Sequence, residues 1–390
     1  MVLAVVLAVV VVAWLSAPTT PSELTINPRG VITASAPGST EPPADLAPTE
    51  PPVLLAAGDW LRMPDSGLIA RTRHSATWTG AELLVWGGQP DPSAAAGARY
   101  DPEAQTWTPM APSPIGSRVG HTATWTGTEL VIVKGAPIGQ VAAAAAQHID
   151  GAAYDPVTDT WREIARTPIA ARTGHTTVWT GEEVVVFGGS PTLQGYIPAG
   201  LYDPATDTWR LSSPSPLARG HGVAAAVWTG TEVVIWTGTG EEDVAAYDPV
   251  TDAWRLLPGS PATMRSISAV WTGEEVLLLG QPERGRPEVG GMALDVDQQR
   301  WTILPPSPLG MAATFAAVWT GSEAIVVGGS SVMPGAVWSP ALGRWAPLPG
   351  GSQAAIGGHS ATWTGEQLLV WGGQGANRPL ASGLVFQPTG

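Results

Sequence analysis

Arginine and histidine recur at fixed distances ahead of a repeated tripeptide, Trp-Thr-Gly. Arginine stands seven residues before the tryptophan and histidine stands four residues before it. We call this set the polar arc: Arg71, His74, Arg118, His121, Arg172, His175 and His359. Guanidinium groups bind carboxylates through paired hydrogen bonds, and imidazoles add further donors and acceptors. The polar arc therefore predicts a site for an anionic or polyhydroxyl ligand, such as a carboxylate-bearing sugar or an acidic peptide.

A structural interpretation of the same residues stays open. Arg-x-x-His stands at the head of the repeated unit, where the histidine could bond to a neighbouring loop instead of a ligand. A metal site is not expected, because equivalent positions of successive repeats are too widely spaced for one ion with His–metal bonds of about 2.0 Å. The sequence also predicts no cofactor.

The tripeptide itself marks a repeat. Copies follow one another at intervals of 43 to 54 residues, and a period in this range is typical of repeat architectures. They begin at Trp78, Trp125, Trp179, Trp228, Trp271, Trp319 and Trp363. After each copy come a short apolar run, in four copies ending in Gly-Gly, and then a position that is tyrosine in four copies. Such short, β-branched runs stopped by glycine favour strands over helices.

The order Trp179-Thr-Gly, Gly188-Gly189, Tyr202 and Trp209 resembles the kelch repeat, as found in galactose oxidase-like propellers. The resemblance covers residues 57–390. It implies an all-β fold: a seven-bladed kelch-type β-propeller with four antiparallel strands, a to d, in each blade. The label galactose oxidase-like implies a copper enzyme, but the radical cofactor of that family needs a cysteine cross-linked to tyrosine. This sequence has no cysteine, so copper oxidase activity is rejected.

A second tryptophan, expected on strand d, occurs only six times. These residues are Trp107, Trp161, Trp209, Trp254, Trp301 and Trp345. Blade 7 stops soon after Phe386, before a strand d of its own. We therefore expect the N-terminal strand around Trp60 to complete blade 7 and close the ring, which removes the exposed edges of an open array.

Antiparallel strands place the a–b and c–d turns on one face and the b–c and d–a loops on the other. The first face repeats Thr-Gly-x-Glu and Asp-Pro, which we interpret as turn chemistry with solvated charge. The second face carries loops that differ in every blade, and variable loops on a rigid scaffold are where binding sites commonly evolve. The polar arc falls on this face, on the adjacent blades 7, 1, 2 and 3.

Composition limits the partners and the compartment. The net charge of −14 argues against nucleic acid or an anionic membrane surface as the main partner. Residues 1–16 are almost wholly apolar and are expected to be a secretion signal or an uncleaved membrane anchor. Residues 17–56 are rich in proline and threonine and are expected to form a disordered linker. The abundance of alanine, glycine and proline, with one lysine, favours a bacterial source.

These features predict an extracytoplasmic binding or interaction module, membrane-anchored by the N-terminal segment or secreted. A monomer is expected, with a protein or carbohydrate ligand on the b–c/d–a loop face. One alternative is a sugar-modifying enzyme, such as a sialic-acid-type epimerase, that uses the polar arc. A second alternative is a structural or sensory ectodomain without a small ligand.

Overall fold

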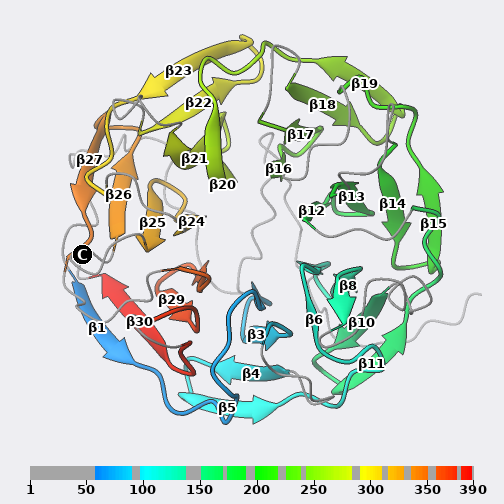
Figure 1. Cartoon of the computed structure of the whole chain (residues 1–390), viewed down its shortest axis with the longest axis vertical. Helices are drawn as coiled ribbons and strands as arrows, with labels where there is room; N and C mark the ends of the chain where they lie inside the picture. The colour runs from blue at the N-terminus through cyan, green and yellow to red at the C-terminus, as the bar shows by residue number, and fades with distance from the viewer. Residues whose placement is uncertain are drawn as a thin grey trace, which may run out of the picture. The chain divides into compact units, whose positions relative to one another are not determined.

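The computed structural model describes residues 58–89, 97–137, 151–169, 174–189, 198–217, 225–238, 243–282, 290–309, 315–328, 335–349, 357–375 and 379–388. Seven antiparallel four-stranded sheets stand around a ring, so the predicted seven-bladed kelch-type propeller is confirmed (Figure 1). The expected signal or anchor segment, 1–16, and the expected linker, 17–56, lie outside the described residues. No helix in the described part of the chain is long and apolar enough to cross a membrane.

Each blade contributes one strand to each of four concentric positions. Strands a, next to the axis, are β2 (Ser75–Trp78), β7 (Thr122–Trp125), β12 (His175–Trp179), β16 (Ala225–Trp228), β20 (Met264–Trp271), β24 (Phe315–Trp319) and β28 (Ser360–Trp363). Strands b are β3 (Leu83–Trp86), β8 (Leu130–Val133), β13 (Val184–Gly188), β17 (Val233–Trp236), β21 (Glu275–Pro282), β25 (Ala324–Gly328) and β29 (Leu368–Trp371).

Strands c and d form the outer half of each blade. Strands c are β4 (Gly97–Asp101), β10 (Gly151–Asp155), β14 (Gly200–Asp203), β18 (Val244–Asp248), β22 (Gly291–Asp295), β26 (Gly335–Ser339) and β30 (Gly383–Pro388). Strands d are β5 (Thr106–Pro109), β11 (Thr160–Glu163), β15 (Thr208–Leu211), β19 (Ala253–Leu256), β23 (Arg300–Leu304), β27 (Arg344–Pro347) and β1 (Gly58–Arg62). A small additional pair, β6 (Arg118–Val119) with β9 (Ala136–Pro137), extends blade 2.

The ring closes as the tryptophan count predicts. β1 pairs antiparallel with β30, and Trp60 lies opposite Phe386 in the register. The two rings also pack together, with centroids 5.2 Å apart. The N-terminal strand therefore supplies strand d of blade 7.

The hydrophobic core lies between blades. All seven buried clusters join residues of two adjacent blades; for example, Leu84 and Trp86 of blade 1 pack with Tyr154 of blade 2. The strand-d tryptophans also donate from Nε1 to a carbonyl of the preceding blade at six junctions. These bonds are Trp60 to Pro349 (2.7 Å), Trp161 to Ala111 (2.9 Å), Trp209 to Ala165 (2.9 Å), Trp254 to Ser213 (3.0 Å), Trp301 to Pro258 (2.8 Å) and Trp345 to Pro305 (3.0 Å).

Glycine determines where strand b ends. Gly87 and Gly88 both have positive φ, +70° and +87°, which turns the chain out of the extended conformation. Blade 5 has Gly280-Gln281 at this place, and there β21 continues to Pro282, paired with an equally long β20. Blade 2 keeps the left-handed turn although Lys134 replaces the first glycine, with φ of +55°.

Candidate functional site

The described arginines of the polar arc are buried and bind the backbone. Arg71 is fully buried and donates from Nη1 to the Gly87 carbonyl at 2.9 Å and from Nε to the Ile69 carbonyl at 3.1 Å. Arg118, 3% exposed, donates to the carbonyls of Ile115, Lys134 and Gly135 at 3.3 to 3.4 Å. Arg172 lies outside the described residues. Arg71 and Arg118 therefore support the loops at the head of strand a.

The histidines of the polar arc bond across blade junctions. His74 Nε2 lies 2.9 Å from Ser360 Oγ of blade 7, and His121 Nε2 lies 3.1 Å from Ser75 Oγ of blade 1. His175 Nε2 of blade 3 lies 2.9 Å from Thr122 Oγ1 of blade 2. In each case the hydroxyl residue directly follows the histidine position of its own blade. His359 closes the series by bonding to the Val327 carbonyl of blade 6 at 3.0 Å.

Burial keeps the imidazoles of His74, His121 and His359 uncharged. Burial is the main cause that lowers the pKa of His74 to about 3 and that of His121 to about 4. The charge of Arg71, with His121 and His359, adds to the effect on His74. Burial also lowers the pKa of His359. At neutral pH these three side chains act as hydrogen-bonding groups and not as cations.

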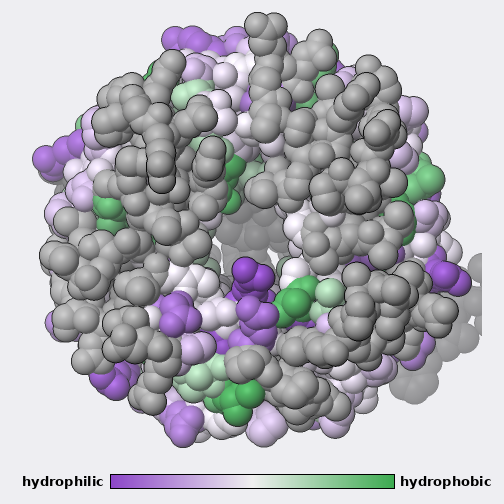
Figure 2. Space-filling model, viewed as in Figure 1, coloured by the Kyte–Doolittle hydropathy of each residue, from purple (hydrophilic) through white to green (hydrophobic). Residues whose placement is uncertain are grey.

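The Gly-Gly motif makes room for these histidines. A Cβ on Gly87 would stand 2.6 Å from His121 Cε1, and a Cβ on Gly372 would stand 2.7 Å from His74 Cε1. The imidazole rings of His121 and His74 also pack edge-on against the tryptophans that directly precede these two glycines. The ring centroids of His121 and Trp86 are 4.9 Å apart. The structure thus brings the described residues of the polar arc together on adjacent blades, in structural roles. Their ligand-binding role stays a prediction. Figure 2 shows a group of hydrophilic residues, in purple, just below the middle of the ring in this view.

The opposite face is built from the Thr-Gly and Asp-Pro turns. In the first turn of blade 2, Thr126 Oγ1 accepts from the Glu129 amide at 3.1 Å, and the same bonding recurs around the ring. In the second turn, the Asp155 carboxylate accepts from the Val157 amide and the Thr158 hydroxyl, both at 2.8 Å. The Thr158 hydrogen bond is the main cause that lowers the pKa of Asp155. The expected turn chemistry is present.

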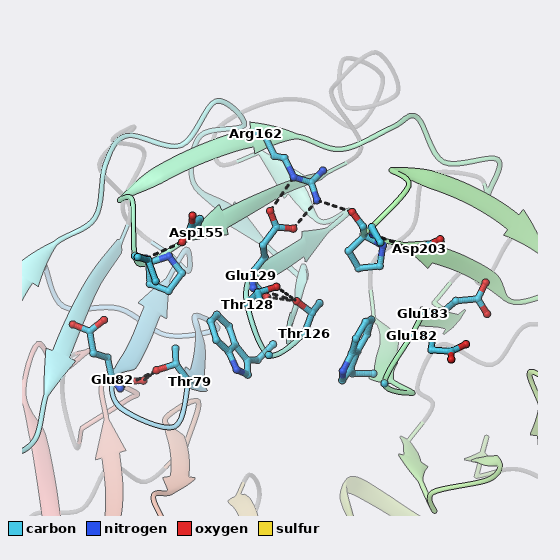
Figure 3. Close-up of a pocket in the computed structure, with 18 of the residues that line it drawn as sticks. Thr79, Glu82, Thr126, Thr128, Glu129, Asp155, Arg162, Glu182, Glu183 and Asp203 are labelled. Atoms are coloured by element: carbon cyan, nitrogen blue, oxygen red, sulfur yellow. Dashed lines mark hydrogen bonds and ion pairs between the residues drawn. The ribbon is translucent and has the colours of Figure 1, made fainter. Parts of the chain in front are cut away.

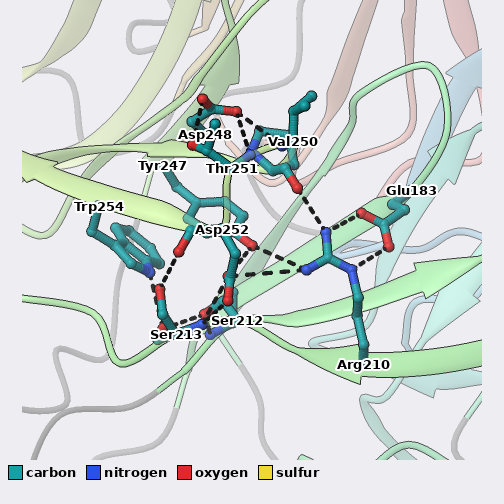
Figure 4. A network of polar contacts seen from close by, with 12 residues as sticks. Glu183, Arg210, Ser212, Ser213, Tyr247, Asp248, Val250, Thr251, Asp252 and Trp254 are labelled. Atoms are coloured by element: carbon teal, nitrogen blue, oxygen red, sulfur yellow. Dashed lines mark hydrogen bonds and ion pairs between the residues drawn. The ribbon is translucent and has the colours of Figure 1, made fainter.

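The glutamates of this face, however, are more than solvated charges. Glu129 receives two hydrogen bonds from Arg162, at 3.0 and 2.6 Å, and Glu183 receives two from Arg210, at 2.7 and 2.6 Å. Arg210 also reaches the next blade, where Pro249 offers its carbonyl at 3.0 Å (Figure 4). Tryptophan followed by arginine at residues 161, 209 and 254 was the sequence feature that could have revealed these pairs.

Blade 1 reaches the same arrangement from a different strand. Its strand d has Thr108 where blade 2 has Arg162, but Thr108 pairs with Arg99 of β4. Arg99 Nη1 donates to the Pro156 carbonyl of blade 2 at 2.6 Å and lies 3.4 Å from Glu82. In blade 1 the arginine thus stands on strand c, opposite the strand-d position that Arg162 occupies in blade 2. Its partners, a turn glutamate and a proline carbonyl of the next blade, correspond to those of Arg162.

These turns surround a wide, open depression of about 1240 Å³ over blades 1 to 3 (Figure 3). Its walls are the Thr-Gly turns of the three blades, the Asp-Pro turns of blades 2 and 3, and the half-buried rings of Trp125 and Trp179. Six carboxylates line it: Glu82, Glu129, Asp155, Glu182, Glu183 and Asp203. We call it the acidic depression; the sequence identified its turns but not their convergence.

The described residues do not fit the copper cofactor that galactose oxidase-like proteins imply. Without cysteine the chain cannot form the tyrosine–cysteine cross-link. Tyr154 and Tyr202 donate their hydroxyls to Asp159 and Asp207 at 2.6 and 2.7 Å, and burial, together with these bonds, raises the pKa of both phenols. Within the described ranges, no three His, Asp or Glu side chains are grouped closely enough to hold a metal ion.

Comparisons with known proteins agree with this architecture. A family model described as the KLHDC2/KLHL20/DRC7 Kelch-repeats domain matches residues 73–280, more than half of the chain. Among solved structures, the chain resembles a fungal alcohol oxidase of the AA5 family in complex with copper, with a TM-score of 0.61 and 15% identity. The match covers 86% of this chain and 76% of the oxidase, and at this identity it shows the fold alone. The sequence has no match among curated proteins. With its seven four-stranded blades and this family match, the chain belongs to the kelch-repeat domains.

Proposed function

We propose that this propeller is a binding module that recognises a protein or carbohydrate partner without converting it. The observation that carries the proposal is the acidic depression, which is wide, open and built from turns that the blade junctions hold in place. Rigid presentation of a surface reduces the ordering cost of binding. Kelch propellers typically act as protein-interaction modules, so a protein partner is the first choice.

The polar groups nearest the axis support binding over catalysis. His74 and His121 are engaged with hydroxyls of neighbouring blades, and Arg71 and Arg118 with carbonyls. A general acid or base must instead reach a substrate atom directly or through one water. The sequence predicts a second surface for a partner on the variable b–c and d–a loops, which lie largely outside the described residues.

The N-terminal segments support a location outside the cytoplasm. Residues 1–16 supply an apolar run, and residues 17–56 supply a proline-rich spacer between that run and the ring. Deletion of residues 1–50 should release the protein from membrane fractions and leave its melting temperature unchanged. Release without a change in melting supports a membrane anchor, and secretion of the full-length protein supports the same location, whereas a full-length protein found in the cytosolic fraction contradicts it.

The proposed function is tested by probing peptide and glycan arrays with the full chain. If the chain is a binding module, it should bind one ligand class saturably. The bound ligand should then be recovered chemically unchanged. Conversion of a bound sugar would favour the epimerase-type alternative. Absence of binding on both arrays would favour a structural or sensory ectodomain. Mass spectrometry of the recovered ligand separates the first two outcomes.

A further inference from the structure

Arginine balances the negative charge of the acidic depression only in part. Arg99, Arg162 and Arg210 bind Glu82, Glu129 and Glu183, the glutamates of the three Thr-Gly turns. No ion pair to a described residue is made by the three other lining carboxylates, which are Asp155, Glu182 and Asp203. The depression therefore carries an excess of negative charge.

Apolar surface lies between these carboxylates. Trp125 and Trp179 line the depression and are only half-buried. Val157 is 91% exposed at the tip of the blade 2 Asp-Pro turn, on its rim. Tryptophan faces attract Lys and Arg side chains through the ring quadrupole, and their aliphatic stems pack on apolar surface. The negative charge and the aromatic surface thus both favour a ligand that carries Lys or Arg side chains.

Two of these carboxylates, those of Asp155 and Asp203, are held in place before any ligand arrives. Asp203 accepts from the Ala205 amide at 2.8 Å and from the Thr206 hydroxyl at 2.7 Å, as Asp155 does with its own turn. The Thr206 hydrogen bond is the main cause that lowers the pKa of Asp203, so this group is ionised at neutral pH. Fixed anions lose little conformational freedom when a cation binds.

We propose that the acidic depression binds a basic, extended segment of a partner protein, recognised through its Lys or Arg side chains. The proposal rests on the proposed function and assigns the partner's chemistry to the a–b/c–d face. An anionic ligand is disfavoured by the excess of carboxylates. A small sugar is disfavoured by size, because the volume of about 1240 Å³ exceeds the usual range for small-molecule pockets and the site is open.

The repeat supplies a matched control for the test. Val157 and Glu182 line the depression, whereas Val250 and Glu274 occupy the same turn positions in blades 4 and 5, outside it. Val250 is 88% exposed, close to Val157, and both glutamates are exposed. The double variants V157K/E182K and V250K/E274K therefore make the same change in net charge at two places.

Binding of fluorescein-labelled decalysine to the full chain is measured by anisotropy, with decaglutamate as the opposite-charge probe. V157K/E182K should weaken decalysine binding by about tenfold or more, and V250K/E274K by about twofold or less. Binding to the parent chain should weaken as salt is raised, because the attraction is electrostatic. The isosteric pair Glu182→Gln and Glu274→Gln repeats the comparison if the lysine variants fold poorly.

Equal effects of the two double variants would overturn the proposal, since binding would then follow net charge alone. Preferential binding of decaglutamate, or of a neutral glycan that V157K/E182K weakens, would overturn it as well. In each of these cases the proposed function survives if the arrays give a ligand elsewhere on the ring. Only the absence of any ligand on the arrays removes both proposals together.

Discussion

Blades 1 to 3 and blades 5 and 6 follow the same strand plan but are joined by different chemistry. Blades 1 to 3 use imidazole–hydroxyl bonds on one face. On the other face, arginines pair with a glutamate of their own blade and donate to the next blade, as Arg162 does to Tyr202. At the histidine position blades 5 and 6 have Ile267 and Phe315, and after the strand-d tryptophan they have Thr302 and Ala346. Their junction is packed with apolar side chains such as Leu277, Leu279 and Val326.

Glu275 of blade 5 shows the effect of having Thr302, instead of an arginine, after the strand-d tryptophan. It occupies the same turn position as Glu129 and Glu183, but its strand d offers Thr302. Burial, with Asp295 and Glu274 nearby, raises the pKa of Glu275. Apolar packing and the Trp345–Pro305 hydrogen bond thus join blades 5 and 6, which carry no histidine at this position. The glutamate–arginine pairs extend from blade 1 to blade 4, where Arg255 binds Glu232 at 2.6 Å, and blade 5 forms its four strands with Thr302 in place of the arginine.

The largest effect is expected where the two regions meet. Blade 7 lies between blades 6 and 1, and deletion of residues 57–63 removes its strand d. Five register pairs are lost and β30 becomes an exposed edge, so we expect a loss on the order of 5 kcal/mol in the free energy of unfolding. Urea denaturation measures the loss. A midpoint equal to that of the parent chain would show that β1 does not close the ring.

The next test concerns the contact between Gly87 and His121. Gly87→Ala should destabilise the protein by about 2–4 kcal/mol, because a Cβ adds a clash to an unfavourable positive φ. Gly127→Ala is the control: its φ is +97°, but a Cβ there meets nothing within 4 Å, so about 1–2 kcal/mol is expected. In a His121→Ala background the Gly87→Ala cost should fall toward the control value, leaving the contact of the new Cβ with the Arg118 carbonyl at 3.1 Å. Equal costs with and without His121 would reject the role of the imidazole.

A smaller effect is expected from the arginines. Arg162→Ala leaves Glu129 without its partner and removes the contact with Tyr202, so we expect about 1–2 kcal/mol, reduced by solvent because Arg162 is 35% exposed. The matched change in blade 5, Thr302→Ala, should cost below about 0.5 kcal/mol. Similar losses for both variants in thermal unfolding would remove the distinction between the two regions.

Near pH 6 the smallest effect is expected from protonation of the histidines at the blade junctions. The folded pKa values of His74 and His121, about 3 and 4, lie below the ordinary value of 6.5. The unfolded chain therefore binds protons first as the pH falls, so this contribution to stability is complete above pH 6.5 and decreases toward pH 4. At pH 6 each of these histidines should lower the free energy of unfolding by roughly 1 kcal/mol relative to its value at high pH. His121→Gln should remove its share from the pH profile; an unchanged profile would contradict the assignment.

The fold could be predicted from the sequence because its determinants are local. Trp-Thr-Gly turns, Gly-Gly stops and strand-d tryptophans each act within a few residues of the chain, and counting them placed β1 in blade 7. The same counting placed the polar arc on neighbouring blades. The depth of Arg71 and Arg118 could not be predicted, because it depends on loops packed from another blade. Arg99 gave no local indication either, since its role follows from a cross-strand exchange with Thr108.

Hydrogen exchange of the full chain with and without decalysine tests the central claim most directly, because it reports on every blade at once. The account predicts that the peptide slows exchange in the Thr-Gly and Asp-Pro turns of blades 1 to 3, around Glu129, Asp155 and Glu182. The corresponding turns of blades 5 and 6, around Glu275 and Glu323, should be unchanged. Protection spread evenly over all seven blades, or confined to blades 5 and 6, would contradict the claim that the polar region forms the binding site.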